Sequence, residues 1–96
     1  MTLAAVLAAL SDPVRVRIVC TLAAEPERTC GGFELGISKA TRSHHFKVLR
    51  EAGLTHTRSE GTHRYVSLRR DDVDGRFPGL LEAVLTAAER EAAVPA

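Results

Sequence analysis

Hydrogen-bonding and cationic side chains are concentrated between Ser38 and Gly53, in the run SKATRSHHFKVLREAG. The run predicts one helix, because Ser38 is suited to cap its start and Gly53 to end it with a positive φ. Phe46, Leu49 and Ala52 fall on one stripe that can be buried. Donors, small hydroxyls and positive charge on the opposite face suit the major groove of DNA. Taken alone, the same pattern is also typical of a solvated amphipathic helix.

The next segment, LTHTRSEGTHRYVSL at residues 54–68, predicts a β-hairpin. Its residues alternate on both sides of Ser-Glu-Gly at 59–61, which supplies the turn. Arg58, His63 and Arg64 lie near the expected tip. A basic helix that passes through a glycine into a basic hairpin is the arrangement of a helix-turn-helix with a wing.

The run S-K-A-T-R-S-H-H-F-K-V-L-R-E-A-G-L, with the upstream run L-S-D-P-V-R-V-R-I-V, resembles the ArsR/SmtB family of bacterial winged-helix repressors. The resemblance implies a single winged helix-turn-helix domain that is mainly α with a small β-hairpin (α+β), with about five helices plus the wing. It divides residues 1–96 into dimerisation helices at 1–10 and 78–93, a helix-turn-helix at 28–53 and a wing at 54–68.

Charge is distributed unevenly along the chain, although the formal net charge is only +1. Residues 38–70 hold eight Lys or Arg and two acids, together with all four histidines, whereas the remainder is acidic. This asymmetry favours a polyanionic partner, and double-stranded DNA fits it best. A membrane surface fits less well, because the basic segment has no large apolar face to insert. Two cysteines with no export signal indicate the reducing cytoplasm.

Apolar stripes on the first and last helices predict self-association. A chain of 96 residues has little core to cover both stripes. In the family, these helices pair across a homodimer, which would place two recognition helices about 34 Å apart on an imperfect palindrome. The expected dimer-interface residues are Leu3, Val6, Leu7, Leu10, Leu80, Leu81, Val84, Leu85 and Ala88.

Two features depart from the family pattern. Gly31-Gly32 costs about 2 kcal/mol of helix propensity relative to alanine, so the positioning helix is expected to be short, at residues 32–35. Arg42 occupies the stripe of Phe46 and Leu49, where an aliphatic residue is expected, and it can snorkel to the DNA backbone.

Recognition of DNA is therefore assigned to two groups of side chains. His45 is included in the first group, but it lies about 100° around the helix from His44 and can instead hydrogen-bond within the domain. The helix group is Ser38, Lys39, Thr41, Arg42, Ser43, His44, His45 and Lys47, and the wing group is Arg58, Thr62, His63 and Arg64.

The family couples DNA release to metals, metalloids, thiol oxidation or organic molecules. We expect no metal and no cofactor, because the chain has no Cys-x-Cys and no histidine in its last helix, and His56 with His63 supplies only two ligands. Cys20 and Cys30 can form a thiol switch, or a metalloid site with a third donor, if their Cα atoms lie within about 7 Å. Arg28 would favour a thiolate at Cys30. Alternatively, Cys20 packs as a small apolar residue and Cys30 is an incidental loop thiol.

The sequence shows no nucleophile elbow, phosphate loop or paired carboxylates, so we expect no enzyme. A winged-helix module that binds protein and not DNA is the alternative, and the concentrated positive charge disfavours it. We therefore expect a homodimeric, cytoplasmic, DNA-binding repressor.

Overall fold

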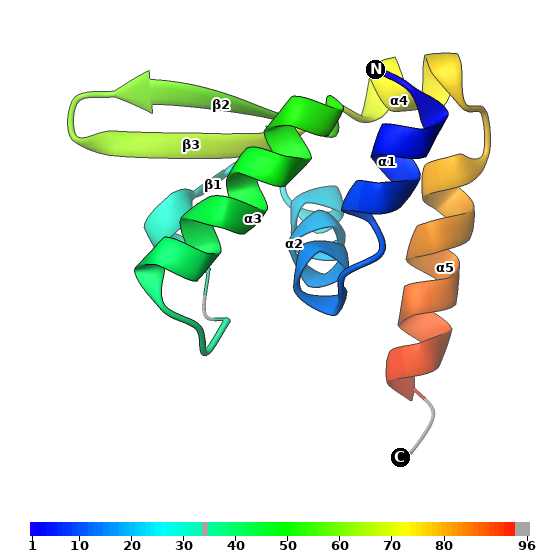
Figure 1. The fold of residues 1–96 in the computed structure, drawn as a ribbon, viewed down its shortest axis with the longest axis horizontal. Helices are drawn as coiled ribbons and strands as arrows, with labels where there is room; N and C mark the ends of the chain where they lie inside the picture. Colours follow the sequence, from blue (N-terminus) through cyan, green and yellow to red (C-terminus); the bar gives the residue numbers. More distant parts are fainter. Residues whose placement is uncertain (34, 94–96) are drawn as a thin grey trace.

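The computed structural model describes residues 1–33 and 35–93. Figure 1 shows the β-hairpin projecting at one end of the molecule, α5 along the opposite side and α3 crossing between them. In chain order, the elements are α1 (Leu3–Ala9), α2 (Pro13–Ala24), β1 (Arg28–Thr29), the 3₁₀ turn η1 (Cys30–Gly32), α3 (Lys39–Ala52), β2 (Thr55–Glu60), β3 (His63–Leu68), α4 (Arg70–Arg76) and α5 (Leu80–Ala93).

The predicted boundaries of α3 are confirmed by its caps. The Ser38 hydroxyl accepts a hydrogen bond from the Thr41 backbone N–H at 3.2 Å, which satisfies one free donor of the first turn. Gly53 ends the helix in the left-handed conformation, with φ 87°. Helix α2 also begins with a capping residue, Asp12, and has Pro13 at its first position.

The wing belongs to a three-stranded antiparallel sheet in the order β1-β3-β2. Glu60 pairs with His63, so the turn is Gly61-Thr62; it begins two residues and ends one residue later than the predicted Ser-Glu-Gly turn. Gly61 takes φ 59°, a conformation that glycine adopts without steric cost. Strand β1, which was not predicted, pairs Arg28 with Val66 and thereby ties the base of the wing to the end of α2.

A single hydrophobic core joins the helices to the sheet. Ile18 of α2, Leu49 of α3 and Val66 of β3 are each fully buried. Val73 of α4 and Leu81 of α5 complete the same cluster from the C-terminal side. The orientation of α3 is therefore fixed by packing against both α2 and the sheet.

The helices differ from the prediction in two places. Where the positioning helix was expected, the chain makes the η1 turn at Cys30–Gly32, and Phe33 follows in extended conformation. A side chain on Gly32 would place its Cβ 2.9 Å from the Thr29 hydroxyl, so this tight turn favours glycine. Glu34, also part of the expected helix, lies outside the described residues. Helix α4 was not predicted; it forms despite Gly75 because Val73 is buried and Asp71 and Asp72 suit its first turn.

Candidate nucleic-acid interface

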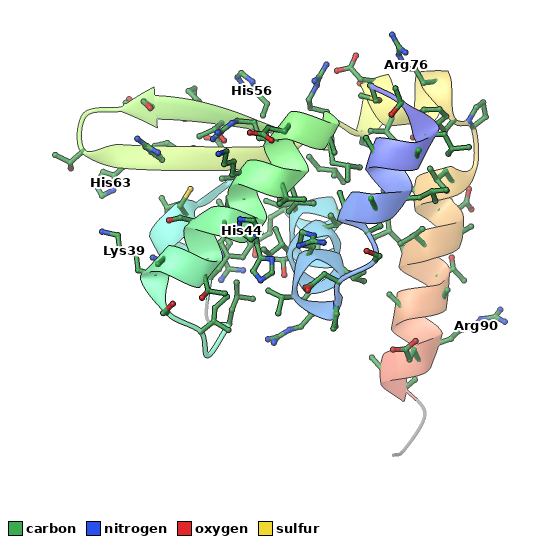
Figure 2. All side chains as sticks on the ribbon, in the orientation of Figure 1. Lys39, His44, His56, His63, Arg76 and Arg90 are labelled. Atoms are coloured by element: carbon green, nitrogen blue, oxygen red, sulfur yellow. The ribbon has the colours of Figure 1, made fainter. Side chains whose placement is uncertain are left out.

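The outward face of α3 carries three exposed polar side chains near its middle, Ser43, His44 and Lys47. Their three- and four-residue spacing places them along one side of the helix. His44 projects from the middle of α3 in Figure 2. Lys47 lies 3.9 Å from Glu51 in an exposed i,i+4 pair, which solvent screens strongly. This face can present both donors and acceptors to a base edge.

The first turn of α3 carries two hydroxyls that are bonded to each other. Ser38 Oγ donates to Thr41 Oγ1 at 2.9 Å while it caps the helix. The Ser38 side chain is therefore committed to the helix terminus, whereas the exposed Thr41 hydroxyl keeps its own proton for donation.

His45 is only 8% exposed, which corrects its inclusion among the groove-facing residues. Its Nδ1 lies 3.2 Å from Nη1 of Arg15, and because a guanidinium can only donate, Nδ1 is the acceptor. Arg15 Nε also donates to the carbonyl of Ala9 at 2.6 Å, and Nη2 donates to that of Ala8 at 3.4 Å. One arginine of α2 thus connects the end of α1 to the recognition helix.

A cleft of about 720 Å³ separates α3 from the wing and η1. One stripe of α3, with members three or four residues apart, forms its near wall, and β2, β3 and η1 form the rest. Figure 2 shows Lys39 projecting from the start of α3 and His63 from the hairpin, and both residues line the cleft. Its lining residues are Thr29, Cys30, Gly31, Lys39, Arg42, Ser43, Phe46, Arg50, Thr57, Thr62, His63 and Arg64.

Among the residues that the structure describes, the lining of this cleft contains no carboxylate. Four of its side chains, which we call the cleft cations, make no ion pair within residues 1–33 and 35–93: Lys39, Arg42, Arg50 and Arg64. Arg42 therefore faces the wing and not the core. Arg50 was missed from the sequence, although its spacing of eight residues from Arg42, with Phe46 halfway, marks the same stripe.

Arg58 differs from the cleft cations because acids of the same chain bind it. Its guanidinium donates to Glu27 at 2.7 Å and also to Glu60, and it lies 4.5 Å from the centre of the Tyr65 ring. Hydrogen bonds to Glu27 and Glu60 raise the pKa of Arg58. The structure brings Thr62, His63 and Arg64 to the cleft but turns Arg58 toward its own acids.

Cys20 and Cys30 are both free thiols with different surroundings. Burial raises the pKa of Cys20, and the negative charge of Glu89 on α5 raises it further. Cys30 lines the cleft; burial raises its pKa, while Arg64, Arg42 and Arg50 act in the opposite direction. The pKa of Cys30 is raised overall, whereas the sequence predicted that Arg28 would favour a thiolate there.

The histidines of the wing do not come together. His56 pairs with Ser67 and His63 with Glu60, so the two lie four residues apart along the hairpin, about 13 Å by strand geometry. Among the described residues, no three His, Cys, Asp or Glu side chains gather in a group that could hold a metal ion.

The expected dimer-interface residues divide between the core and the surface. Val6 and Leu81 are fully buried within one chain, and Leu10, Leu80 and Leu85 pack against the core, so these five serve the monomer first. Leu3 and Leu7 are each 48% exposed on α1. Val84 and Ala88 of α5 are partly exposed. None of the helices within the described residues is long and apolar enough to cross a bilayer.

Comparison with known proteins supports this geometry. Residues 12–57 match the model of the bacterial regulatory protein arsR family. The chain is 48% identical over 79 residues, 79% of each chain, to YceK of Bacillus subtilis, described as an uncharacterized HTH-type transcriptional regulator. Among solved structures, the transcriptional repressor BigR from Xylella fastidiosa is 34% identical, with a TM-score of 0.70 over 88% of this chain and 83% of BigR.

A second solved structure is the homodimeric winged helix-turn-helix DNA-binding domain of Mb0332 from Mycobacterium bovis, a possible ArsR-family regulator. It is 28% identical, with a TM-score of 0.73 over 93% of this chain and 80% of that one. The wing and the recognition helix of the structure lead to the same family as these similarities. The chain belongs to the ArsR family of bacterial regulatory proteins and is a DNA-binding transcriptional regulator.

Proposed function

We propose that two copies of this chain form a cytoplasmic repressor that lays its two α3 helices into successive major grooves of an imperfect palindrome. The observation that carries the proposal is the set of four cleft cations, which have no ion-pair partner within the described residues. Unpaired cations beside an exposed helix form an electrostatic site for phosphate groups.

The side chains then divide by role, because phosphate contacts position a protein while base contacts specify the sequence. Ser43, His44 and Lys47 on the outward face of α3 reach the base edges. The four cleft cations, with Thr62 and His63 at the hairpin tip, hold the backbone that runs between α3 and the wing. Arg58 keeps the wing in shape by binding Glu27 and Glu60.

The first turn of α3 contributes in two ways. Ser38 fixes the helix terminus and leaves free backbone N–H groups near a phosphate. Thr41 is exposed beside it and adds a hydroxyl donor. His45, in contrast, orients α3 from inside the domain through Arg15.

Dimerisation uses the exposed part of α1, where Leu3 and Leu7 lie, together with the partly exposed Val84 and Ala88 of α5. A related winged-helix domain, that of Mb0332, is homodimeric. Burying two half-exposed leucines from each copy removes apolar surface that one chain cannot cover.

Fluorescence anisotropy of the protein on DNA from upstream of its own gene, across a salt series, tests this function. We expect tight binding that weakens steeply with salt, because each phosphate contact releases counterions. Arg50→Ala should weaken binding and flatten the salt dependence. Arg70→Ala, which removes the same charge from an exposed pair with Asp74 on α4, should change neither. Binding no tighter than to random DNA would favour a protein-interaction module instead.

Release from DNA is assigned to thiol chemistry, or to a metalloid held by a thiol. The separate surroundings of Cys20 and Cys30 favour independent roles over one shared bond. Replacing each cysteine with serine and measuring operator binding with and without the oxidant diamide identifies the responsive thiol. Equal protection by both replacements would instead indicate a Cys20–Cys30 disulfide.

A further inference from the structure

Cys30 lies beside the surface that is proposed to bind DNA. It lies in the η1 turn, is partly buried, and forms part of the cleft between α3 and the wing. The thiol is therefore next to the surface proposed to hold a DNA phosphate.

Within residues 1–33 and 35–93, the charge that acts on this thiol has one sign. Arg64, Arg42 and Arg50 lie close enough to act on its ionisation, and each favours the thiolate. The described lining of the cleft adds Lys39 and His63 but no carboxylate. A cavity with one nucleophile and several unpaired cations suits a reagent that is both thiol-reactive and negatively charged.

Cys20 provides the opposite case within the same chain. It is also a partly buried free thiol, but the charged group that acts on it is Glu89 of α5. The two thiols therefore differ in the sign of the surrounding charge more than in burial.

We propose that Cys30 and the four cleft cations form a modification site for small disulfides that carry carboxylate or sulfonate groups, and that the attached anion displaces a DNA phosphate from the cleft. The consequence for DNA binding rests on the proposed function, whereas the charge selectivity of the reaction does not. Release then occurs by direct competition at the DNA surface.

The reaction is thiol–disulfide exchange. The Cys30 thiolate attacks one sulfur of R–S–S–R, a Cys30–S–S–R bond forms, and R–S⁻ leaves with the electron pair of the broken S–S bond. The proton lost by Cys30 passes to solvent or to the leaving thiolate. The small disulfide is the oxidant, and excess thiol reverses the reaction by the same route. A cleft of about 720 Å³ has room for the attached group.

The first arm of the test measures charge selectivity without DNA. In a Cys20→Ser variant, Cys30 is the one thiol of the chain. We expect sulfonatoethyl methanethiosulfonate, an anion, to modify it about tenfold or more faster than the cationic trimethylammonioethyl analogue at low salt. The matched Cys30→Ser variant keeps Cys20, beside Glu89, as its one thiol, and this thiol should react faster with the cationic reagent. High salt should remove both preferences.

Equal rates for the two reagents at Cys30 would overturn the proposed site, whatever the protein does with DNA. A second variant guards against an accidental preference, because Arg42→Ala/Arg64→Ala in the Cys20→Ser background should lower the ratio toward one. A ratio that this double replacement leaves unchanged would also overturn the proposal.

The second arm measures operator binding of the modified Cys20→Ser protein. We expect the sulfonate adduct to weaken binding by about tenfold or more and to flatten the salt dependence, because cleft cations no longer contact phosphate. The small neutral methylthio adduct should weaken binding much less. Equal losses from both adducts would refute competition by charge. If unmodified Cys20→Ser protein binds only nonspecifically, the proposed function fails, while the rate ratio still decides the modification site.

Discussion

Two faces of the chain, one formed by α3 and the wing and the other by α1, are both suited to a partner, but to partners of different chemistry. The first presents charged groups, which water solvates well, so it can remain exposed without destabilising the monomer. The second presents Leu3 and Leu7, each 48% exposed, whose hydration is unfavourable. The face formed by α3 and the wing is therefore suited to a partner that binds reversibly and less tightly as the salt concentration rises. The α1 face is suited to a permanent partner, and screening by salt should leave it intact.

Breaking the apolar face should produce the largest effect. Leu3→Glu/Leu7→Glu places four like charges at the proposed dimer interface, and we expect monomers. Without a second recognition helix on the same molecule, affinity for a two-half-site operator should fall by about 10²- to 10⁴-fold. Sedimentation velocity and anisotropy measure the two losses together.

Binding to an isolated half-site supplies the control, because it should be unchanged by that double replacement. The conservative variant Leu3→Met/Leu7→Met should remain dimeric, since the swap preserves volume and apolar character. A glutamate variant that stays dimeric would move the interface away from α1.

The outward face of α3 should give the next largest effect. His44→Ala/Lys47→Ala removes two of the three proposed base-contacting side chains, at about 1–3 kcal/mol for each good contact, while the dimer stays intact. The loss should be larger on operator than on random DNA. Glu51→Gln is the matched control, because it frees Lys47 from its 3.9 Å partner and should leave binding equal or tighter. Normal operator binding by the double variant would remove α3 from the recognition role.

Features set by local chemistry were predictable from the sequence. Ser38 and Gly53 act on backbone groups within one helical turn, so their identities alone placed the ends of α3. The wing followed from alternation and Gly61, although its turn begins two residues later than predicted.

Features set by tertiary packing were not predictable. A stripe of apolar residues looks the same whether it faces the core or a second copy, and so Val6 and Leu81 were assigned to the wrong surface. Helix α4 depends on the burial of Val73, which outweighs the helix-breaking tendency of Gly75. His45 and Arg50 lie on either side of the polar face of α3. The position of Arg15 shows that His45 faces the interior, and the position of the wing shows that Arg50 faces the cleft.

The wing allows a narrower test of the cationic face, because Arg58 and Arg64 lie on neighbouring strands with the same charge. Arg64→Ala should make the slope of log affinity against log salt less steep by about 1, the loss of one phosphate contact. Arg58→Ala should leave the slope unchanged, because Glu27 and Glu60 already bind this guanidinium. Equal changes in slope would show that Arg58 leaves its acids to reach DNA.

The smallest effect concerns α2, which connects the two faces through Arg15. The pKa of Asp12 is lowered from 3.8: burial opposes the shift, but hydrogen bonds from the backbone N–H groups of Arg15 and Val14 outweigh it. A lowered pKa means that the cap stabilises the fold above pH 3.8 and loses this contribution as pH falls through the folded-state value. Asp12→Ala should cost about 1 kcal/mol of unfolding free energy at pH 7, and less as the pH falls through the lowered folded-state pKa of Asp12, by urea denaturation. Asp12→Asn caps without a charge, so its stability relative to wild type should improve as pH falls.

Because α2 supports both faces, the loss in Asp12→Ala should appear in global unfolding and leave the dimer and the salt slope of DNA binding unchanged. A cap variant that altered the salt slope alone would instead place Asp12 in the DNA surface.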